Sequence, residues 1–172
     1  MEGTGNIILI GMPGSGKSTL GVVLAKMLGM RFVDLDLVIQ EREGETLQET
    51  IDGRGTEEFL RIENEVLAGF ECEDTVISTG GSAVYAEEGM ANLASGGTVV
   101  YLFVSLDELD ERLGGFDGRG VVFREGVGGT LADLYDERKP YYERYADITY
   151  DVTGTSIREA ATALSKILHG TF

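Results

Sequence analysis

The sequence contains no tryptophan, one cysteine, one histidine and two prolines, and its 14 basic residues are outnumbered by 30 acidic ones. The single Cys72 excludes a framework of internal disulfides and fits a reducing compartment. The net charge of −16 argues against general affinity for nucleic acid or for an anionic membrane, because both would be repelled. No stretch has the order of a signal peptide, and no apolar run approaches membrane-spanning length. We therefore expect a cytoplasmic protein that has neither nucleic acid nor a membrane as its partner.

The 172 residues fit one domain, and a hydrophobic content of 42% argues against disorder. Short β-type runs alternate with stretches of helical periodicity, which predicts an α/β fold with a parallel sheet and crossover helices. Most of the runs are continuously apolar, as expected for strands with both faces covered. We expect one domain over residues 1–172 and a monomer. The expected strands are Asn6–Ile10, Arg31–Leu35, Thr75–Ser78, Thr98–Val104 and Ile148–Val152.

Helical periodicity follows the first strand and ends at Gly29, a residue typical of helix ends. Residues 37–70 are also expected to be helical, as two connected helices with breaks at Gly44 and around residues 52–55. Two helices are more than a crossover needs, so residues 34–70 or so are expected to form a separate lobe. Pro140 should kink or break a later helix. The later helices are expected at 86–93, 106–113, 131–145 and 157–168.

One segment is unusually rich in glycine, because residues 114–129 hold seven glycines in sixteen positions together with Arg119 and Arg124. Ordering such a stretch costs much conformational entropy, so it should be mobile when free. It is either a surface loop without a role or a lid that closes over a ligand and brings arginines to it. Arginines in so acidic a protein favour a lid over about residues 113–129.

The strongest motif lies between the first strand and the first helix. Gly11-Met12-Pro13-Gly14-Ser15-Gly16-Lys17-Ser18, followed by Thr19, matches the phosphate-loop pattern G-x-x-x-x-G-K-[ST]. The glycines let backbone N–H groups surround an anion, and the helix N-terminus adds partial positive charge. Lys17 should bridge the β- and γ-phosphates, and Ser18 should offer a hydroxyl to Mg²⁺. The alternative is a chance glycine turn, but the strand and helix around the motif predict ATP or GTP binding.

Two carboxylates, Asp34 and Asp36, stand at the expected end of the second strand. Alternate strand residues point the same way, so both can face the crevice where open α/β sheets bind ligands. One could hold Mg²⁺ through water, and the other could orient or deprotonate an acceptor hydroxyl. The competing interpretation is that one of them caps the following helix, and Asp36 is the plausible candidate.

Two further features are ambiguous when taken alone. The third strand ends in Ser78-Thr79-Gly80-Gly81-Ser82, where Gly80 and Gly81 permit close approach to a small ligand or make a plain turn. Arg138, on a late helix, could bind an anionic substrate or pair with a surface acid. The positions three and four residues away hold a leucine and three tyrosines, so a neighbour on the same helix offers no acid. Both interpretations of Arg138 stay open.

Together these residues resemble shikimate kinases of the nucleoside-monophosphate-kinase-like P-loop group. The likeness runs over nearly the whole chain, from Gly11–Thr19 through the aspartates, Phe59 with Glu63, and Thr79–Gly81, to Arg119 and the Arg138 that precedes Pro140. It implies a five-stranded parallel sheet with helices on its faces, a substrate lobe and a lid. The implied roles are Ser18 and Asp34 near Mg²⁺, Asp36 on the acceptor hydroxyls, Arg138 on a substrate carboxylate, Arg119 as the lid arginine and Arg112 against adenine.

The sequence departs from the family pattern at three places that face the substrate or the lid. Leu60 stands where the family has an arginine after the phenylalanine, and Arg61 is turned ~100° around the helix. Ser82 replaces the third glycine of a G-G-G turn. Residues 119–122 read R-G-V-V instead of R-P-L-L. Loss of one arginine–carboxylate contact is enough to change the preferred substrate.

The leading hypothesis is phosphoryl transfer from ATP and Mg²⁺ to a hydroxyl of a small carboxylated metabolite, with shikimate as the first candidate and a place in aromatic amino-acid biosynthesis. Lys17, Asp36 and Arg119 would act by positioning and charge neutralisation, because neither His169 nor Cys72 offers an obvious nucleophile. One alternative is a kinase of another hydroxy acid or polyol. Another is a nucleotide-dependent switch, which would not need the pair of Asp36 and Arg138.

Overall fold

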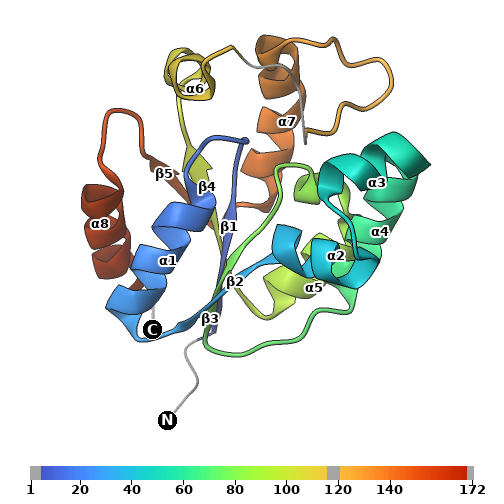
Figure 1. The fold of residues 1–172 in the computed structure, drawn as a ribbon. Helices are drawn as coiled ribbons and strands as arrows, with labels where there is room; N and C mark the ends of the chain where they lie inside the picture. Colours follow the sequence, from blue (N-terminus) through green and yellow to red (C-terminus); the bar gives the residue numbers. More distant parts are fainter. Residues whose placement is uncertain (1–4, 116–120, 170–172) are drawn as a thin grey trace.

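The computed structural model describes residues 5–115 and 121–169. A five-stranded sheet in the order β2-β3-β1-β4-β5 runs through the molecule, and each neighbouring pair of strands is parallel (Figure 1). All five expected strands are present, with each end within one residue of its predicted position. The strands are β1 (Asn6–Ile10), β2 (Arg31–Asp34), β3 (Thr75–Ser78), β4 (Gly97–Phe103) and β5 (Ile148–Asp151).

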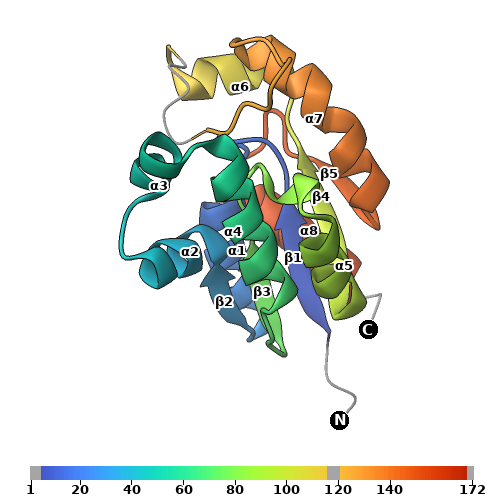
Figure 2. The ribbon, with the colours of Figure 1, turned by 90° about the vertical axis from the view of Figure 1, so that its right-hand side faces the viewer.

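Helices cover both faces of this sheet and make a three-layer structure. α1 (Lys17–Leu28) and α8 (Ile157–His169) lie side by side over one face, and α4 (Thr56–Ala68) and α5 (Glu87–Ser95) lie over the other (Figures 1 and 2). Every residue of β1 is buried, which explains why its sequence is apolar without alternation. The central strand therefore leads straight from the core into the phosphate loop.

Three helices, rather than the expected two, follow β2: α2 (Leu35–Glu43), α3 (Leu47–Arg54) and α4. The break at Gly44 is confirmed, and this residue has a φ of 71°. The break expected around residues 52–55 is wrong in extent, because α3 continues to Arg54 and only Gly55, with a φ of 88°, interrupts the helices. A capping box of Thr46 and Glu49 begins α3 and stabilises this short helix.

The expected break at Pro140 is also wrong, because α7 (Leu131–Tyr145) is one helix with this proline inside it. A proline in a helix interior removes one backbone hydrogen bond and costs about 3 kcal/mol. A capping box of Thr130 and Asp133 begins α7, and the buried side chains of Leu134 and Tyr142 anchor it to the core. Packing and capping therefore outweigh the local preference of proline.

The remaining elements are a 3₁₀ turn (Ala83–Tyr85), which precedes α5, and α6 (Leu106–Leu113). The described part of the glycine-rich segment, residues 114–115 and 121–129, contains turns but neither helix nor strand. Arg119 lies outside the described residues. Within the described ranges, no helix is both long and apolar enough to cross a membrane.

Candidate active site

The phosphate loop joins β1 to α1 and borders a cavity of about 300 Å³. Its glycines adopt angles that other residues rarely take, with φ values of 152° at Gly11, 79° at Gly14 and 92° at Gly16. Lys17 is buried beneath the loop, and its Nζ donates to the carbonyl oxygens of Gly11 (2.8 Å) and Met12 (2.9 Å). The cavity is lined by Pro13, Gly14, Gly16, Lys17, Ser18, Thr19, Asp36, Thr79 and Gly81.

The pKa of Lys17 is set by burial and by charged neighbours from two other parts of the chain. Burial lowers the pKa of Lys17 to about 8, while Asp36 raises it and Arg138 lowers it further. Lys17, Asp36 and Gly81 line the same cavity, and Arg138 Nη1 lies beside Gly81. The sequence-predicted residues Lys17, Asp36 and Arg138 are therefore close enough to act on one ligand.

Ser18 and Asp34 meet where α1 begins and β2 ends. Ser18 Oγ donates to Asp34 Oδ2 over 2.6 Å, and the Ser78 hydroxyl lies 3.1 Å from the same Oγ. Among the described residues no three acidic, histidine or cysteine side chains form a metal-binding group. One hydroxyl and one carboxylate nevertheless fit Mg²⁺, which prefers oxygen ligands and keeps several waters or phosphate oxygens.

Asp36 is not on a strand, because β2 ends at Asp34 and α2 begins at Leu35. Asp34, rather than Asp36, caps this helix by accepting a hydrogen bond from the Asp36 N–H at 3.0 Å. The expected alternation along a strand is therefore wrong for this pair, although both carboxylates still reach the crevice. Burial raises the pKa of Asp36, the Asp34 carboxylate raises it further, and Lys17 opposes both.

Gly80 leaves room for two carboxylates that approach its backbone closely. A Cβ on Gly80 would lie 2.6 Å from Asp36 Oδ1 and 3.1 Å from Glu63 Oε1. The neighbouring Gly81 is equally crowded, since a Cβ there would lie 2.6 Å from Arg138 Nη1 and 2.9 Å from Pro13 Cδ. The paired glycines thus accommodate side chains that line the site.

Arg138 is 1% exposed, and its Nη2 donates to the Val122 carbonyl oxygen at 2.6 Å. Among the described residues it makes no ion pair, so the interpretation as a surface ion pair is wrong. Its Nη1 lies beside Gly81, whose carbonyl oxygen accepts a hydrogen bond of 2.7 Å from the Tyr142 hydroxyl. The buried guanidinium is therefore held beside Gly81, the neighbour of the Gly80 that Asp36 approaches.

Glu63 had no role assigned from the sequence alone, yet it is buried beside the site. Its Oε2 accepts a hydrogen bond of 2.7 Å from Ser82 Oγ. Burial raises its pKa to about 7, Asp36 raises it too, and Ser82 and Arg138 oppose this. A signal was present, since Glu63 stands on the apolar stripe of α4 between Phe59 and Val66. A carboxylate on a buried helix face is uncommon unless it has a partner or a function.

Arg112 lies at the phosphate loop, whereas Leu60 and Arg61 lie on α4. Arg112 Nη1 donates to the carbonyl oxygens of Gly14 (3.2 Å) and Ser15 (3.3 Å), which places it on the outside of the phosphate loop. Leu60 is half-buried. Arg61 is exposed and bound to two glutamates of α4 itself, so it does not substitute for a cation at position 60.

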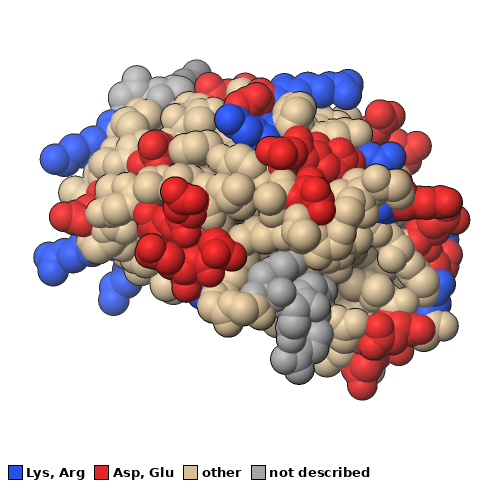
Figure 3. All heavy atoms as spheres, turned by 90° about the horizontal axis from the view of Figure 1, so that it is seen from above, with Lys and Arg blue, Asp and Glu red and all other residues tan. Residues whose placement is uncertain are grey.

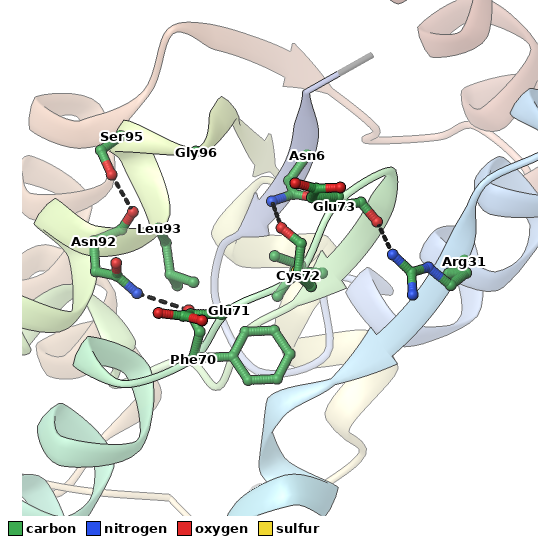
Figure 4. A pocket seen from close by; sticks show the side chains of 11 residues that line it. Asn6, Arg31, Phe70, Glu71, Cys72, Glu73, Asn92, Leu93, Ser95 and Gly96 are labelled. Carbon is green, nitrogen blue, oxygen red and sulfur yellow. Dashed lines mark hydrogen bonds between the residues drawn. The ribbon is translucent and has the colours of Figure 1, made fainter. Parts of the chain in front are cut away.

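A separate cavity of about 500 Å³ lies at the other end of the sheet, where β1 and β2 begin (Figure 4). Polar side chains on its walls are bound to backbone: Asn6 Nδ2 donates to Cys72 O at 2.8 Å and Asn92 Nδ2 to Phe70 O at 2.9 Å. Burial raises the pKa of the Cys72 thiol. A thiol far from the phosphate loop and biased towards its neutral form fits the expectation that Cys72 is no nucleophile.

The acidity of the chain is visible on the face that carries the carboxyl ends of the strands. Figure 3 shows several clusters of Asp and Glu there, with Lys and Arg between and around them. The fold, the phosphate loop, and the carboxylates and arginine beside it define a P-loop kinase of the nucleoside-monophosphate-kinase-like group.

Comparisons with known proteins narrow this class. The family profile described as shikimate kinase matches residues 13–169. A shikimate kinase of Legionella pneumophila (strain Corby) is 38% identical over 166 residues, which covers 96% of this chain and 95% of the relative. This chain belongs to the shikimate kinase family.

Solved structures agree with this assignment. The shikimate kinase from Acinetobacter baumannii in complex with shikimate superposes with a TM-score of 0.84 at 26% identity, covering 98% of this chain and 94% of that one. The shikimate kinase from Aquifex aeolicus gives a TM-score of 0.78 at 31% identity, covering 96% of this chain and 97% of that one.

Proposed function

We propose that the protein transfers the γ-phosphoryl group of ATP to a hydroxyl of shikimate. The observation that carries this proposal is the placement of Asp36 against Gly80 and of Arg138 against the adjacent Gly81, in a site that also contains Lys17. The Asp36 carboxylate can bind a substrate hydroxyl, and the buried Arg138 guanidinium can bind a substrate carboxylate. Together they suit a hydroxy acid as the substrate. The A. baumannii relative in complex with shikimate supports the same acceptor.

On the nucleotide side, the loop N–H groups and Lys17 would hold the phosphates. Ser18 and Asp34 would hold Mg²⁺, which offsets phosphate charge when bound. Arg112 would lie against the adenine, as the family resemblance implies. Arg119, which lies outside the described residues, stays a sequence prediction for the lid residue that neutralises charge in the transition state.

On the acceptor side, Asp36 would orient the hydroxyl and accept its proton as the new P–O bond forms. Its raised pKa favours this, since a base with a higher pKa binds the departing proton more readily. Arg138 would fix the carboxylate and thereby set which hydroxyl faces ATP. Arg138 is buried and Asp36 is half-buried, so water screens their contacts less than on the surface.

An assay of ADP release with purified protein, ATP and Mg²⁺ tests the proposal. ATP turnover should be negligible until shikimate is added and should then rise at least about a hundredfold, because positioning the acceptor supplies much of the catalysis. Turnover at the same rate with and without acceptors would favour a nucleotide-dependent switch.

A second candidate is phosphorylation of another small hydroxy acid or polyol. Leu60 favours it, because this half-buried position on α4 offers no charge to a substrate carboxylate. The same assay with a panel of hydroxy acids and polyols discriminates the two candidates. Under either one, we propose a cytoplasmic monomer, and with shikimate a role in aromatic amino-acid biosynthesis.

A further inference from the structure

A larger cavity, of about 740 Å³, lies between α4 and residues 121–125. Leu60 lines it from α4, and Phe123 and Arg124 line it from the other segment. Arg54 also borders this cavity, but its guanidinium is paired with two glutamates of the same lobe at 2.7 and 2.8 Å. Arg61 is exposed and tied to two glutamates of α4. Of the two described arginines that line this cavity, Arg124 is the less engaged, because it forms one long ion pair, with Glu137 at 3.4 Å, while both Nη atoms of Arg54 are paired with glutamates.

The contacts of Arg124 hold it in place without using its whole guanidinium. Its Cζ lies 4.7 Å from the centroid of the Tyr85 ring, within the range of a cation–π contact. Nη1 donates to the Tyr141 hydroxyl at 3.0 Å and contacts Glu137 Oε1 at 3.4 Å. Within residues 5–115 and 121–169, Nε and Nη2 of Arg124 make no hydrogen bond. These two nitrogens can therefore donate hydrogen bonds to a carboxylate.

Tyr85 connects Arg124 to the catalytic cavity, because a second guanidinium contacts the same ring. Arg138 Cζ lies 5.4 Å from the Tyr85 centroid, and Arg138 Nε donates to the Tyr85 hydroxyl at 3.4 Å. Arg138 in turn reaches Gly81 in the wall of the phosphate-loop cavity. Two cations around one neutral ring repel each other, and an anion bound near both would relieve this repulsion.

We propose that Arg124 is a second substrate-binding cation, which grips the acceptor's carboxylate together with Arg138. This inference rests on the proposed function and names the class of acceptor: a ring-bearing hydroxylated carboxylate. Arg124 approaches from residues 121–125, and Leu60 meets the acceptor from α4 with an apolar surface. The carboxylate accepts hydrogen bonds from Nε and Nη2 of Arg124, and the Leu60 side chain packs against the ring of the acceptor.

The variant Arg124→Met tests this, because it keeps the length of the side chain and removes the charge. Shikimate binding by calorimetry and steady-state kinetics are compared with those of Arg61→Met, a matched control in which an exposed arginine of α4 is lost. We expect the Kd and KM for shikimate to rise about tenfold in Arg124→Met, as for one charge-assisted contact at a half-exposed side chain. The turnover number and the KM for ATP should stay unchanged, and Arg61→Met should behave as the wild type.

Two further measurements separate a lost charge contact from a lost packing contact. Shikimate carboxamide should bind the wild type and Arg124→Met equally, because it has no carboxylate for Arg124 to grip. Adding Leu60→Arg to Arg124→Met should restore shikimate binding by supplying a cation from the opposite wall. Because the Arg124 side chain is 43% exposed, the variant should melt at the wild-type temperature.

Equal shikimate affinity of the wild type and Arg124→Met would overturn the inference, whatever the turnover. A wild type that binds shikimate without phosphorylating it would contradict the proposed function, while the ratio of the two Kd values would still decide the role of Arg124. A wild type that neither binds nor phosphorylates shikimate would overturn both.

Discussion

Ser82 donates a hydrogen bond of 2.7 Å to Glu63 Oε2 in the interior, while Glu63 Oε1 has no partner among residues 5–115 and 121–169. This unpaired oxygen and Asp36 Oδ1 both lie against Gly80. A buried carboxylate with one unsatisfied oxygen is costly when charged, and a second carboxylate nearby increases the cost. Glu63 is therefore stabilised by a proton, which makes its charge state depend on pH near neutrality.

Glu63 should make the fold less stable as pH rises. Its pKa is about 7 in the folded state against an ordinary 4.5, so between these values the folded chain holds a proton that the unfolded chain has released. This stability is fully present below pH 4.5 or so and is lost as pH rises through 7. Glu63→Gln should remove this loss and, from pH 5 to pH 8, gain on the order of 2 kcal/mol relative to the wild type. Urea unfolding of both proteins at the two pH values measures it, and a difference that does not change with pH would contradict it.

Asp36→Asn should abolish most turnover while nucleotide binding survives. The amide cannot accept the proton of the acceptor hydroxyl, and loss of a general base costs roughly 10² to 10⁴ in rate. Single-turnover kinetics and ATP binding by calorimetry separate the two effects. Asp136→Asn, an exposed acid on α7, is the matched control and should keep full activity. Wild-type turnover in Asp36→Asn would show that Asp36 is not the base.

Gly80→Ala should lower turnover at least about tenfold, because the new Cβ must displace Asp36 Oδ1, and small misplacements of reacting groups are costly. Gly53→Ala is its control, since no atom lies within 4 Å of that Cβ position in α3. This control should retain activity and gain about 0.5–1 kcal/mol of stability from better helix propensity. The checks are kinetics and melting of both variants, and an active Gly80→Ala enzyme would show that the Asp36 position is not critical.

Removal of Mg²⁺ by a chelator should stop turnover, and Ser18→Ala should raise the Mg²⁺ concentration needed for half-maximal rate at least about tenfold. In the proposed metal site the hydroxyl of Ser18, 2.6 Å from Asp34 Oδ2, would be an oxygen ligand that alanine cannot replace. Ser95→Ala, an exposed hydroxyl on α5, serves as the control. An unchanged Mg²⁺ requirement in Ser18→Ala would remove Ser18 from the proposed metal site.

Moderate salt should preserve or improve nucleotide affinity. The nucleotide is an anion that approaches a chain of net charge −16, and salt screens the surrounding acids more than the buried Lys17. Calorimetry of ATP and Mg²⁺ binding at low and moderate sodium chloride tests this. A steep fall in affinity with salt would show that attraction to the pocket cations dominates over repulsion by the surface.

Most of the fold could be predicted because local sequence and tertiary context agree. The run from Ile7 to Ile10 is compatible with a strand buried on both faces, and the phosphate loop after it marks the start of a helix. Prediction failed where distant contacts outweigh local preference. α7 continues through Pro140 because buried neighbours such as Tyr142 hold it, and α3, which a capping box begins, includes Gly53.

The site was predictable to the extent that its residues belong to contiguous motifs. Lys17 and Ser18 belong to the phosphate-loop motif, and the two aspartates stand at the end of β2. The capping role of Asp34, however, depends on a backbone angle that the sequence does not report. Tyr85 and Arg124 come from segments far apart in the chain, and only the folded structure brings them together. Their contact therefore had no sequence signal.

The burial of β1 has a consequence for the stability of the whole protein. Its backbone amides pair on both sides with β3 and β4, so they exchange with solvent only when the domain opens globally. Since the loop that cradles phosphates continues directly from this strand, a nucleotide bound there acts on that global equilibrium by mass action. A bound nucleotide would thus stabilise the fold as well as take part in the reaction, and adding ATP should raise the free energy of unfolding.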